Sequence, residues 1–231
     1  MPNIVNNTTF PSLLDLIAPH SCRGCGLIGE ALCNRCKNYI LHKHQPICPN
    51  CKAPSKDGKC PNCNDLPPIY IIGERSGLLG SIVHDYKYQS VRALARPLAE
   101  MLFEVLPNPK STTYIVPAPT ISKHIRKRGL DHTKLIAKEL SKLDPKHYRI
   151  DPVLIRAKET VQVGASQSTR QIQAQNAYQL SPKAVIDTKS NYLLLDDVWT
   201  TGASVRACIK KLQQAGVQNL TVALLSLSRI D

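Results

Sequence analysis

YLLLDDVWTTGAS, the stretch from Tyr192 to Ser204, decides the predicted fold of this chain. Its first four residues, Tyr192 to Leu195, are apolar enough for a strand that is buried on both faces. Two adjacent carboxylates, Asp196 and Asp197, follow the apolar run, and a short turn of hydroxyl residues with one glycine comes next. A helix is predicted directly after the turn, because apolar residues recur at helical spacing at Val205, Ile209 and Leu212.

A buried strand, a tight turn and a helix N-terminus together form a site for an anion. Backbone N–H groups of the turn and the positive end of the helix dipole favour a phosphate. Gly202 lets the backbone approach a ligand closely, and Thr201 and Ser204 add hydroxyl donors. Asp196 and Asp197 precede the turn, where they can accept from sugar hydroxyls or support a Mg²⁺ shell. The alternative is a strand end followed by a capped helix with no ligand.

The order of these residues resembles the phosphoribosyl pyrophosphate (PRPP) motif of type I phosphoribosyltransferases. In that motif an apolar run, two acids and two variable residues precede T-T-G-x-S/T. The resemblance implies that the acids face the ribose hydroxyls, that the turn holds the 5′-phosphate, and that Mg²⁺ accompanies PRPP. Purine-salvage relatives often carry Asp where this chain has Thr200, so the resemblance does not extend to purine salvage. The implied PRPP-binding residues are Asp196, Asp197, Thr200, Thr201, Gly202, Ala203 and Ser204.

Length and composition predict one large domain with a small additional module. The 231 residues are 42% hydrophobic, which is enough for a core, and no run approaches the roughly 18 apolar residues of a membrane span. The first 22 residues contain no Lys or Arg, so we expect no signal peptide and a cytoplasmic location. The formal net charge of +13 fits a polyanion or a phosphorylated small ligand, with simple solubility as the alternative.

Eight of the nine cysteines form four C-x2-C pairs in the N-terminal part of the chain. A two-residue gap lets both thiolates of a pair bind one tetrahedral ion, so the pattern predicts two structural Zn²⁺ sites. A disulfide framework is disfavoured without a secretory signal, and no thioredoxin-like pattern surrounds any pair. Cys208 lies among apolar helix positions and is expected to be an ordinary buried thiol. The predicted ligands are Cys22, Cys25, Cys33, Cys36, Cys48, Cys51, Cys60 and Cys63.

Two pairings of these cysteines are possible. Sequential use assigns the first four to one ion and the last four to the other, and an interleaved arrangement is the alternative. Short loops close at a lower entropy cost, which favours the sequential arrangement. The run Leu66-Pro67-Pro68 then marks a linker. Residues 1–66 are therefore expected to form an N-terminal segment with a double zinc ribbon, and residues 67–231 a phosphoribosyltransferase-like domain.

The larger domain is predicted to be α/β, with a parallel sheet of roughly five strands between helices and the ligand at the carboxyl ends of the strands. Strands are expected at residues 69–75, 114–116, 152–155, 192–195 and 220–227. Helices are expected at residues 78–88 and 91–106, and a third is capped by Asp131 and reaches Leu143.

Two further segments are candidates for the ligand site. Pro117-Ala118-Pro119 follows a predicted strand at the place where the phosphoribosyltransferase resemblance implies a pyrophosphate loop, with a rigid turn as the alternative. Lys123 to Gly129, KHIRKRG, is a basic loop whose Arg126, Lys127 and Arg128 can close over a pyrophosphate or contact nucleic acid. From residue 123 to 149 there are nine Lys or Arg against three Asp or Glu, and a solvated charge run is the alternative.

Taken together, the motifs resemble the ComF family of competence proteins, ComFC/GntX type, over nearly the whole chain. The shared order is a cysteine module, Lys87-Tyr88, V-P-x-P, an R-x-R-G turn, then Gln162, Arg170, Asn176 and Tyr178, then D-D-V-x-T-T-G-x-S. One departure is Gly129-Leu130-Asp131-His132, where many members have G-F-N-Q.

The ComF resemblance implies handling of single-stranded DNA during natural transformation, with a ComF-type helicase as a partner. The intact PRPP motif supports a second class of function, an active phosphoribosyltransferase with an unidentified acceptor. Pyrophosphate release from PRPP discriminates between these two classes. A zinc-ribbon scaffold for protein contacts is a third class, and the intact motif argues against it.

Overall fold

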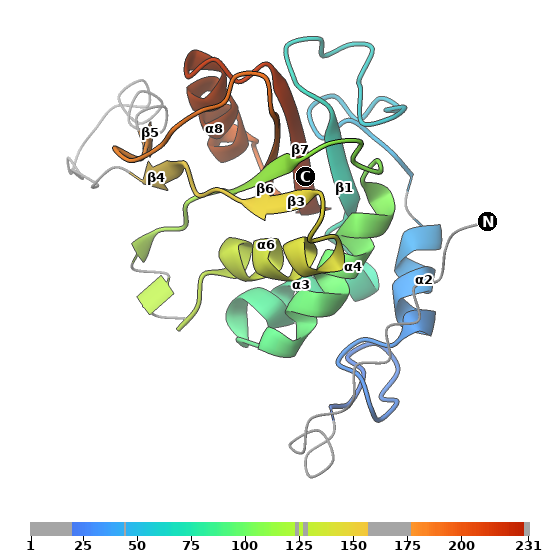
Figure 1. Ribbon diagram of the computed structural model, residues 1–231. Coiled ribbons are helices and arrows are strands. Elements are labelled where there is room, and N and C mark those ends of the chain that lie inside the picture. Colours follow the sequence, from blue (N-terminus) through green and yellow to red (C-terminus); the bar gives the residue numbers. More distant parts are fainter. Residues whose placement is uncertain (1–19, 44, 123–124, 127–128, 157–176, 229–231) are drawn as a thin grey trace, which may run out of the picture.

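The computed structural model describes residues 20–43, 45–122, 125–126, 129–156 and 177–228, and Figure 1 shows their arrangement. A five-stranded sheet forms the centre, in the order β1-β7-β6-β2-β3, and every neighbouring pair in it is parallel. The predicted α/β class with a parallel sheet is therefore confirmed. The strands are β1 (Ile69–Glu74), β2 (Thr113–Pro117), β3 (Tyr148–Ile150), β6 (Asn191–Trp199) and β7 (Asn219–Leu227).

Helices cover both faces of this sheet (Figure 1). Along β6, Leu193 and Leu195 pack with α3, α4 and α6, whereas Tyr192 and Leu194 pack with α8 on the other face. This alternation follows from the pleat of a strand, and it confirms the predicted burial on two faces. The helices are α3 (Gly77–Tyr88), α4 (Ala95–Val105), α6 (His132–Leu143) and α8 (Ala203–Gln214).

Strand β6 is longer than the sequence predicts. The apolar run ends at Leu195, but the strand continues through both aspartates to Trp199. The reason is pairing with β7, where Val198 lies opposite Ser226 and Trp199 opposite Leu227. Asp196 and Asp197 are thus strand residues with side chains on opposite faces, rather than residues of the turn that follows.

The chain reverses its direction of progress across the sheet between β2 and β6. From β2 the chain proceeds to β3 at one edge, and from β6 it proceeds to β7 on the other side. Such a switch point leaves a crevice at the carboxyl ends of the two central strands, where ligands bind in open α/β sheets. Strand β2 ends at Pro117, opposite Leu195, so the last four residues of β6 extend beyond it.

The cysteine-rich region packs directly on the sheet domain. Helix α2 (Asn34–His42) begins after Cys33, and its Cys36 and Ile40 join the core that contains α3 and α4. Lys37 of α2 contacts Glu100 of α4 at 2.5 Å. The predicted boundary between residues 66 and 67 therefore divides the chain by sequence pattern, but the parts on its two sides share one hydrophobic core.

Two short strands, β4 (Leu154–Arg156) and β5 (Tyr178–Leu180), form a separate antiparallel pair beside α8. The predicted strand at residues 152–155 belongs to this pair rather than to the central sheet. A 3₁₀ turn, Arg92–Leu94, precedes α4. None of the helices in the described part of the chain combines the length and the apolarity that a membrane crossing requires.

Candidate functional site

The turn between β6 and α8 has a backbone that requires glycine at Gly202. Its φ is +75°, and a Cβ built there would lie 2.2 Å from the ring of Trp199. Trp199 is buried at the end of β6, so the ring cannot move aside. The residues around Gly202, which are Thr200, Thr201, Ala203 and Ser204, are exposed, and the Ala203 N–H donates to Thr201 Oγ1 at 3.4 Å. The turn therefore presents exposed hydroxyl residues at the N-terminus of α8, the kind of place where helices bind anions.

Asp197 is held in an ion pair that was not predicted from the sequence. Its carboxylate lies 2.7 Å from the Nζ of Lys87, at the C-terminal end of α3, and the two side chains are only 20% and 12% exposed. Two hydrogen bonds between Tyr86 and His132 fix that end of α3 against α6. His132, at the position of the departure from G-F-N-Q, therefore anchors α3. The Lys87-Tyr88 pair in the ComF resemblance was the signal that could have identified Lys87.

Asp196 has a different environment on the opposite face of β6. Its carboxylate accepts the backbone N–H of Asp197 at 2.8 Å. Although the residue keeps some exposed surface, burial of its carboxyl, reinforced by the negative charge of Asp197, raises the pKa of Asp196 to about 7. Near neutral pH, Asp196 is therefore divided between its charged and neutral forms, so it can either accept or donate a hydrogen bond.

The β4–β5 pair forms a wall next to the turn. Arg156 donates to the hydroxyl of Tyr178 at 3.0 Å, and its guanidinium lies 5.2 Å from the centre of that ring. Burial raises the pKa of Tyr178, and a hydrogen bond with Ser204 of the turn partly offsets this effect. Tyr178 thus connects the cation of Arg156 with Ser204 of the turn. Tyr178 belongs to the ComF pattern, whereas no local pattern in the sequence connects Arg156 to α8.

The predicted pyrophosphate loop offers few backbone donors. Pro117 and Pro119 have no N–H, and the N–H of Ala118 donates to Leu195 O at 2.8 Å. The carbonyl of Ala118 accepts from the Thr133 hydroxyl at 3.0 Å, so the segment is fixed on both sides. The role of Pro117, Ala118 and Pro119 stays a prediction, and any backbone donors to a pyrophosphate must come from residues after Pro119.

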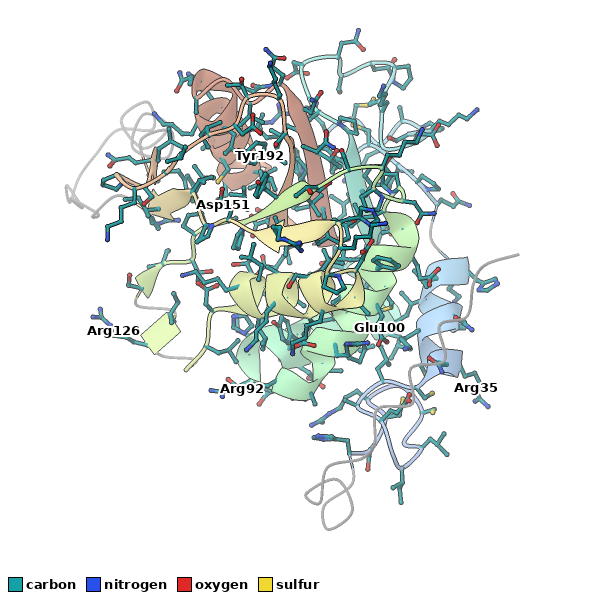
Figure 2. All side chains as sticks on the ribbon, viewed as in Figure 1. Arg35, Arg92, Glu100, Arg126, Asp151 and Tyr192 are labelled. Atoms are coloured by element: carbon teal, nitrogen blue, oxygen red, sulfur yellow. The ribbon has the colours of Figure 1, made fainter. Side chains whose placement is uncertain are left out.

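Only part of the basic loop lies among the described residues. Lys127 and Arg128 lie outside them, as do Gln162, Arg170 and Asn176 of the ComF pattern. Arg126 is exposed, and its neighbour Ile125 is in a helical turn, with N–H···O contacts of 3.1 Å to Ile121 and 2.8 Å from Gly129. Arg92 donates to Gly129 O at 3.0 Å. Figure 2 shows Arg92 and Arg126 toward the same side of the molecule, opposite Arg35.

The eight N-terminal cysteines form two clusters with the sequential pairing that the sequence favours. In each cluster the four cysteine sulfurs all lie within 4.8 Å of one another. Sulfur contacts of 3.7 Å between Cys25 and Cys33 and of 3.4 Å between Cys51 and Cys60 are close to the roughly 3.8 Å edge of a zinc–thiolate tetrahedron. The clusters are Cys22, Cys25, Cys33 and Cys36, and Cys48, Cys51, Cys60 and Cys63.

The thiols of each cluster differ in how readily they ionise. Burial opposes ionisation of Cys22, but backbone N–H groups that donate to its sulfur outweigh burial and lower its pKa to about 6. In contrast, burial raises the pKa of Cys36 and of Cys48 to about 12. A full set of four thiolates therefore needs a cation among them, which a bound metal supplies. The donor set fits a structural divalent metal in both clusters. Cys208, by comparison, is fully buried in α8, as predicted.

One curated protein is similar to nearly the whole chain. No protein-family model matches the chain. A curated protein from Haemophilus influenzae, "Competence protein F", is 27% identical over 216 residues, which are 87% of this chain and 93% of that protein. The resemblance to the ComF family that the sequence predicts is confirmed by this relative.

Solved structures with some similarity have low superposition scores. An allosteric regulatory enzyme of purine biosynthesis gives a TM-score of 0.41 at 17% identity over 62% of this chain, and this chain spans only 30% of that enzyme. A hypoxanthine phosphoribosyltransferase from Staphylococcus aureus gives 0.35 and 0.32 in two crystal forms, at 13% identity in each. In those two forms, 62% and 64% of this chain cover 68% and 61% of the enzyme.

Proposed function

We propose that this chain is a ComF-type competence protein that binds a phosphoribosyl group at the turn between β6 and α8 and handles single-stranded DNA. The observation that carries the proposal is the Gly202 turn, in which exposed Thr200, Thr201 and Ser204 stand at the N-terminus of α8, directly after the strand that carries Asp196, at the switch point of the sheet. The name of the curated relative supports the competence role, because the match spans nearly all of both chains.

PRPP is the proposed ligand, and its groups are assigned by charge. The 5′-phosphate takes the donors from Thr200 to Ser204, with the cation of Arg156 connected to the turn through one tyrosine. A ribose hydroxyl donates to Asp196, while Asp197 is engaged by Lys87 and holds the end of α3 in place. Mg²⁺ keeps most of its waters and prefers phosphate oxygens, so we assign the ion to the pyrophosphate of PRPP rather than to a protein cage.

Single-stranded DNA is the proposed polymeric partner. Lys134, Lys138 and Lys142 are exposed and four residues apart on α6, so they form one stripe. Lys134 pairs with Asp131 and Lys142 with Glu139 on the same helix, but such exposed pairs are weak and DNA phosphates can replace them. Because α6 begins beside the carboxyl end of β2, the stripe leads away from the proposed PRPP site. A ComF-type helicase is proposed as a protein partner from the family resemblance alone.

The decisive experiment measures both ligands on one variant, Arg126→Ala with Lys127→Ala and Arg128→Ala. If the basic loop contacts DNA, affinity for single-stranded DNA falls equally for all sequences, and the slope of log affinity against log salt becomes shallower by up to roughly two units. PRPP affinity then stays unchanged. If the loop closes over pyrophosphate, PRPP affinity falls and DNA binding persists. If the variant keeps its affinity for both PRPP and single-stranded DNA, the loop has no role in binding either ligand.

Phosphoribosyl transfer to an acceptor is the second candidate function, favoured by the intact turn and by the near-neutral pKa of Asp196. Pyrophosphate release from PRPP, measured against a panel of nucleobases and amines, tests it. Release that depends on an acceptor and on Asp196 supports an enzyme. Tight PRPP binding without release with any acceptor supports the competence role.

Zn²⁺ is the proposed metal for both four-cysteine clusters. Protein purified without chelator should contain two zinc ions per chain, because each cluster provides four sulfurs at tetrahedral spacing. Elemental analysis checks this, and one ion or none per chain would contradict it. A chelator should unfold residues 22–63, while the parallel sheet keeps its circular-dichroism signal.

A further inference from the structure

Arg206 connects the phosphate turn to the rest of the molecule. It lies in the first turn of α8, and its backbone N–H donates to Gly202 O at 2.9 Å. Its guanidinium lies 5.6 Å from the centre of the Trp199 ring, within the range of a cation–π contact. The same ring lies against Gly202. Arg206, Trp199 and the turn therefore form one packed unit, in which displacement of the arginine removes support from the ring.

The other end of Arg206 reaches the second cysteine cluster. One terminal nitrogen donates to the side-chain oxygen of Asn50 at 2.6 Å, and the other lies 3.2 Å from a carboxylate oxygen of Asp65. Asn50 is located inside the C-x2-C pair Cys48–Cys51. Its side-chain nitrogen donates to Cys63 Sγ at 3.2 Å. Asn50 is thus bound on one side to a sulfur of the cluster and on the other to α8.

We infer that Asn50 and Arg206 are positioning residues through which metal in the second cluster fixes the phosphate turn. A bound metal fixes the position of the Cys63 sulfur, which accepts from the Asn50 amide at 3.2 Å. Without the metal, the turn between Cys48 and Cys51 loses its fold and Asn50 loses its sulfur partner. Arg206 is then no longer held over Trp199. The inference rests on the proposed phosphate site only for its effect on ligand affinity.

The two contacts of Arg206 should contribute unequally. The Asp65 side chain is 71% exposed, and an ion pair in that setting contributes little. The Asn50 contact is short and charge-assisted, and among the residues that the structure describes Asn50 is the one that connects Arg206 to a metal ligand. The first cluster approaches the site differently, through Arg23, which is half exposed and 3.9 Å from Asp85 of α3. Of the two clusters, the second is therefore the one expected to control the turn.

The chain has one tryptophan, Trp199, so its fluorescence reports on this junction without any ligand. The test compares full-length, metal-loaded wild type with Asn50→Ala and Arg206→Ala, each verified to contain the same metal per chain. Lys37→Ala is the matched control, because it removes the contact between α2 and Glu100. We expect a shifted emission in Asn50→Ala and Arg206→Ala, wild-type emission in Lys37→Ala, and only a small shift in Asp65→Ala.

Metal removal and PRPP binding complete the test. Titration with a chelator should shift the emission of wild type but change that of Asn50→Ala much less. PRPP affinity should fall about tenfold in Asn50→Ala, within the usual range of coupling between two sites. Wild-type emission in metal-loaded Asn50→Ala, or the same chelator response in both proteins, would overturn the inference. If wild type binds no PRPP, the proposed ligand is wrong, while the fluorescence results still decide whether the cluster and the turn are coupled.

Discussion

At the carboxyl end of β6, the two faces of the strand give the neighbouring aspartates different electrostatic environments. On the face toward α3, Asp197 is charged and paired with Lys87 at 2.7 Å. On the face toward α8, burial and the nearby charge of Asp197 raise the pKa of Asp196 to about 7. The difference shows that an acid pair in a motif need not contain two equivalent ligands for ribose. One acid organises the site, and the other is available to a ligand.

The largest expected effect comes from removing the cation on the α3 face. Lys87→Met keeps much of the packing but leaves Asp197 charged and largely buried, which should reduce the free energy of unfolding by about 3 kcal/mol. Chemical denaturation at pH 7.5 measures this. Combining Lys87→Met with Asp197→Asn removes both charges and should recover most of the loss. If the double variant is as unstable as Lys87→Met alone, the ion pair is not the cause.

A smaller and opposite effect is expected on the α8 face. The folded-state pKa of Asp196 is raised from 3.8 to about 7, so between these pH values the folded protein holds a proton that the unfolded chain has lost. The contribution of Asp196 to stability therefore falls as pH rises from about 4 to about 7 and stays low above that. Asp196→Asn should remove this loss and stabilise the protein at pH 8 by at least about 1 kcal/mol, or roughly 2–4 °C in melting temperature.

Melting curves of wild type and Asp196→Asn at pH 4, 6 and 8 check this prediction. The two proteins should agree at pH 4 and diverge as the pH increases, because both side chains are neutral at the acidic end. A constant difference across the three pH values would show that packing, and not ionisation, separates them.

Local patterns in the sequence were sufficient for most of the fold. The apolar run 192–195 predicted a strand buried on both faces, and Asp131 caps α6 through the N–H of Lys134, as expected. The spacing of the cysteines predicted both clusters and favoured their pairing. In each case, the residues that determine the structure lie within about one turn or one short loop of one another.

Features that depend on distant segments were not predictable in this way. Strand β6 continues past Leu195 because β7 pairs with it, and nothing within residues 196–199 indicates that partner. Lys87 and Arg156 reach the site from separate elements, and Arg206 meets Asn50 across 156 residues of sequence. The two prolines show in the sequence that residues 117 and 119 have no N–H to donate. That the Ala118 N–H donates to Leu195 O follows only from the register of β2 and β6, which the sequence does not show.

The central claim is that the turn after β6 and Asp196 at the end of that strand bind a phosphoribosyl ligand, while Asp197 holds Lys87 and the end of α3 in place. Calorimetric titration of PRPP with Mg²⁺ into wild type and into the variant with Asp196→Asn and Asp197→Asn tests it most directly. Loss of the charge-assisted hydrogen bond from the ribose to Asp196 costs on the order of 1.5–3 kcal/mol, and loss of the Asp197–Lys87 pair loosens the site further, so the double variant should bind at least about tenfold more weakly. Equal affinity of the two proteins for PRPP, with both shown to be folded, would contradict the account.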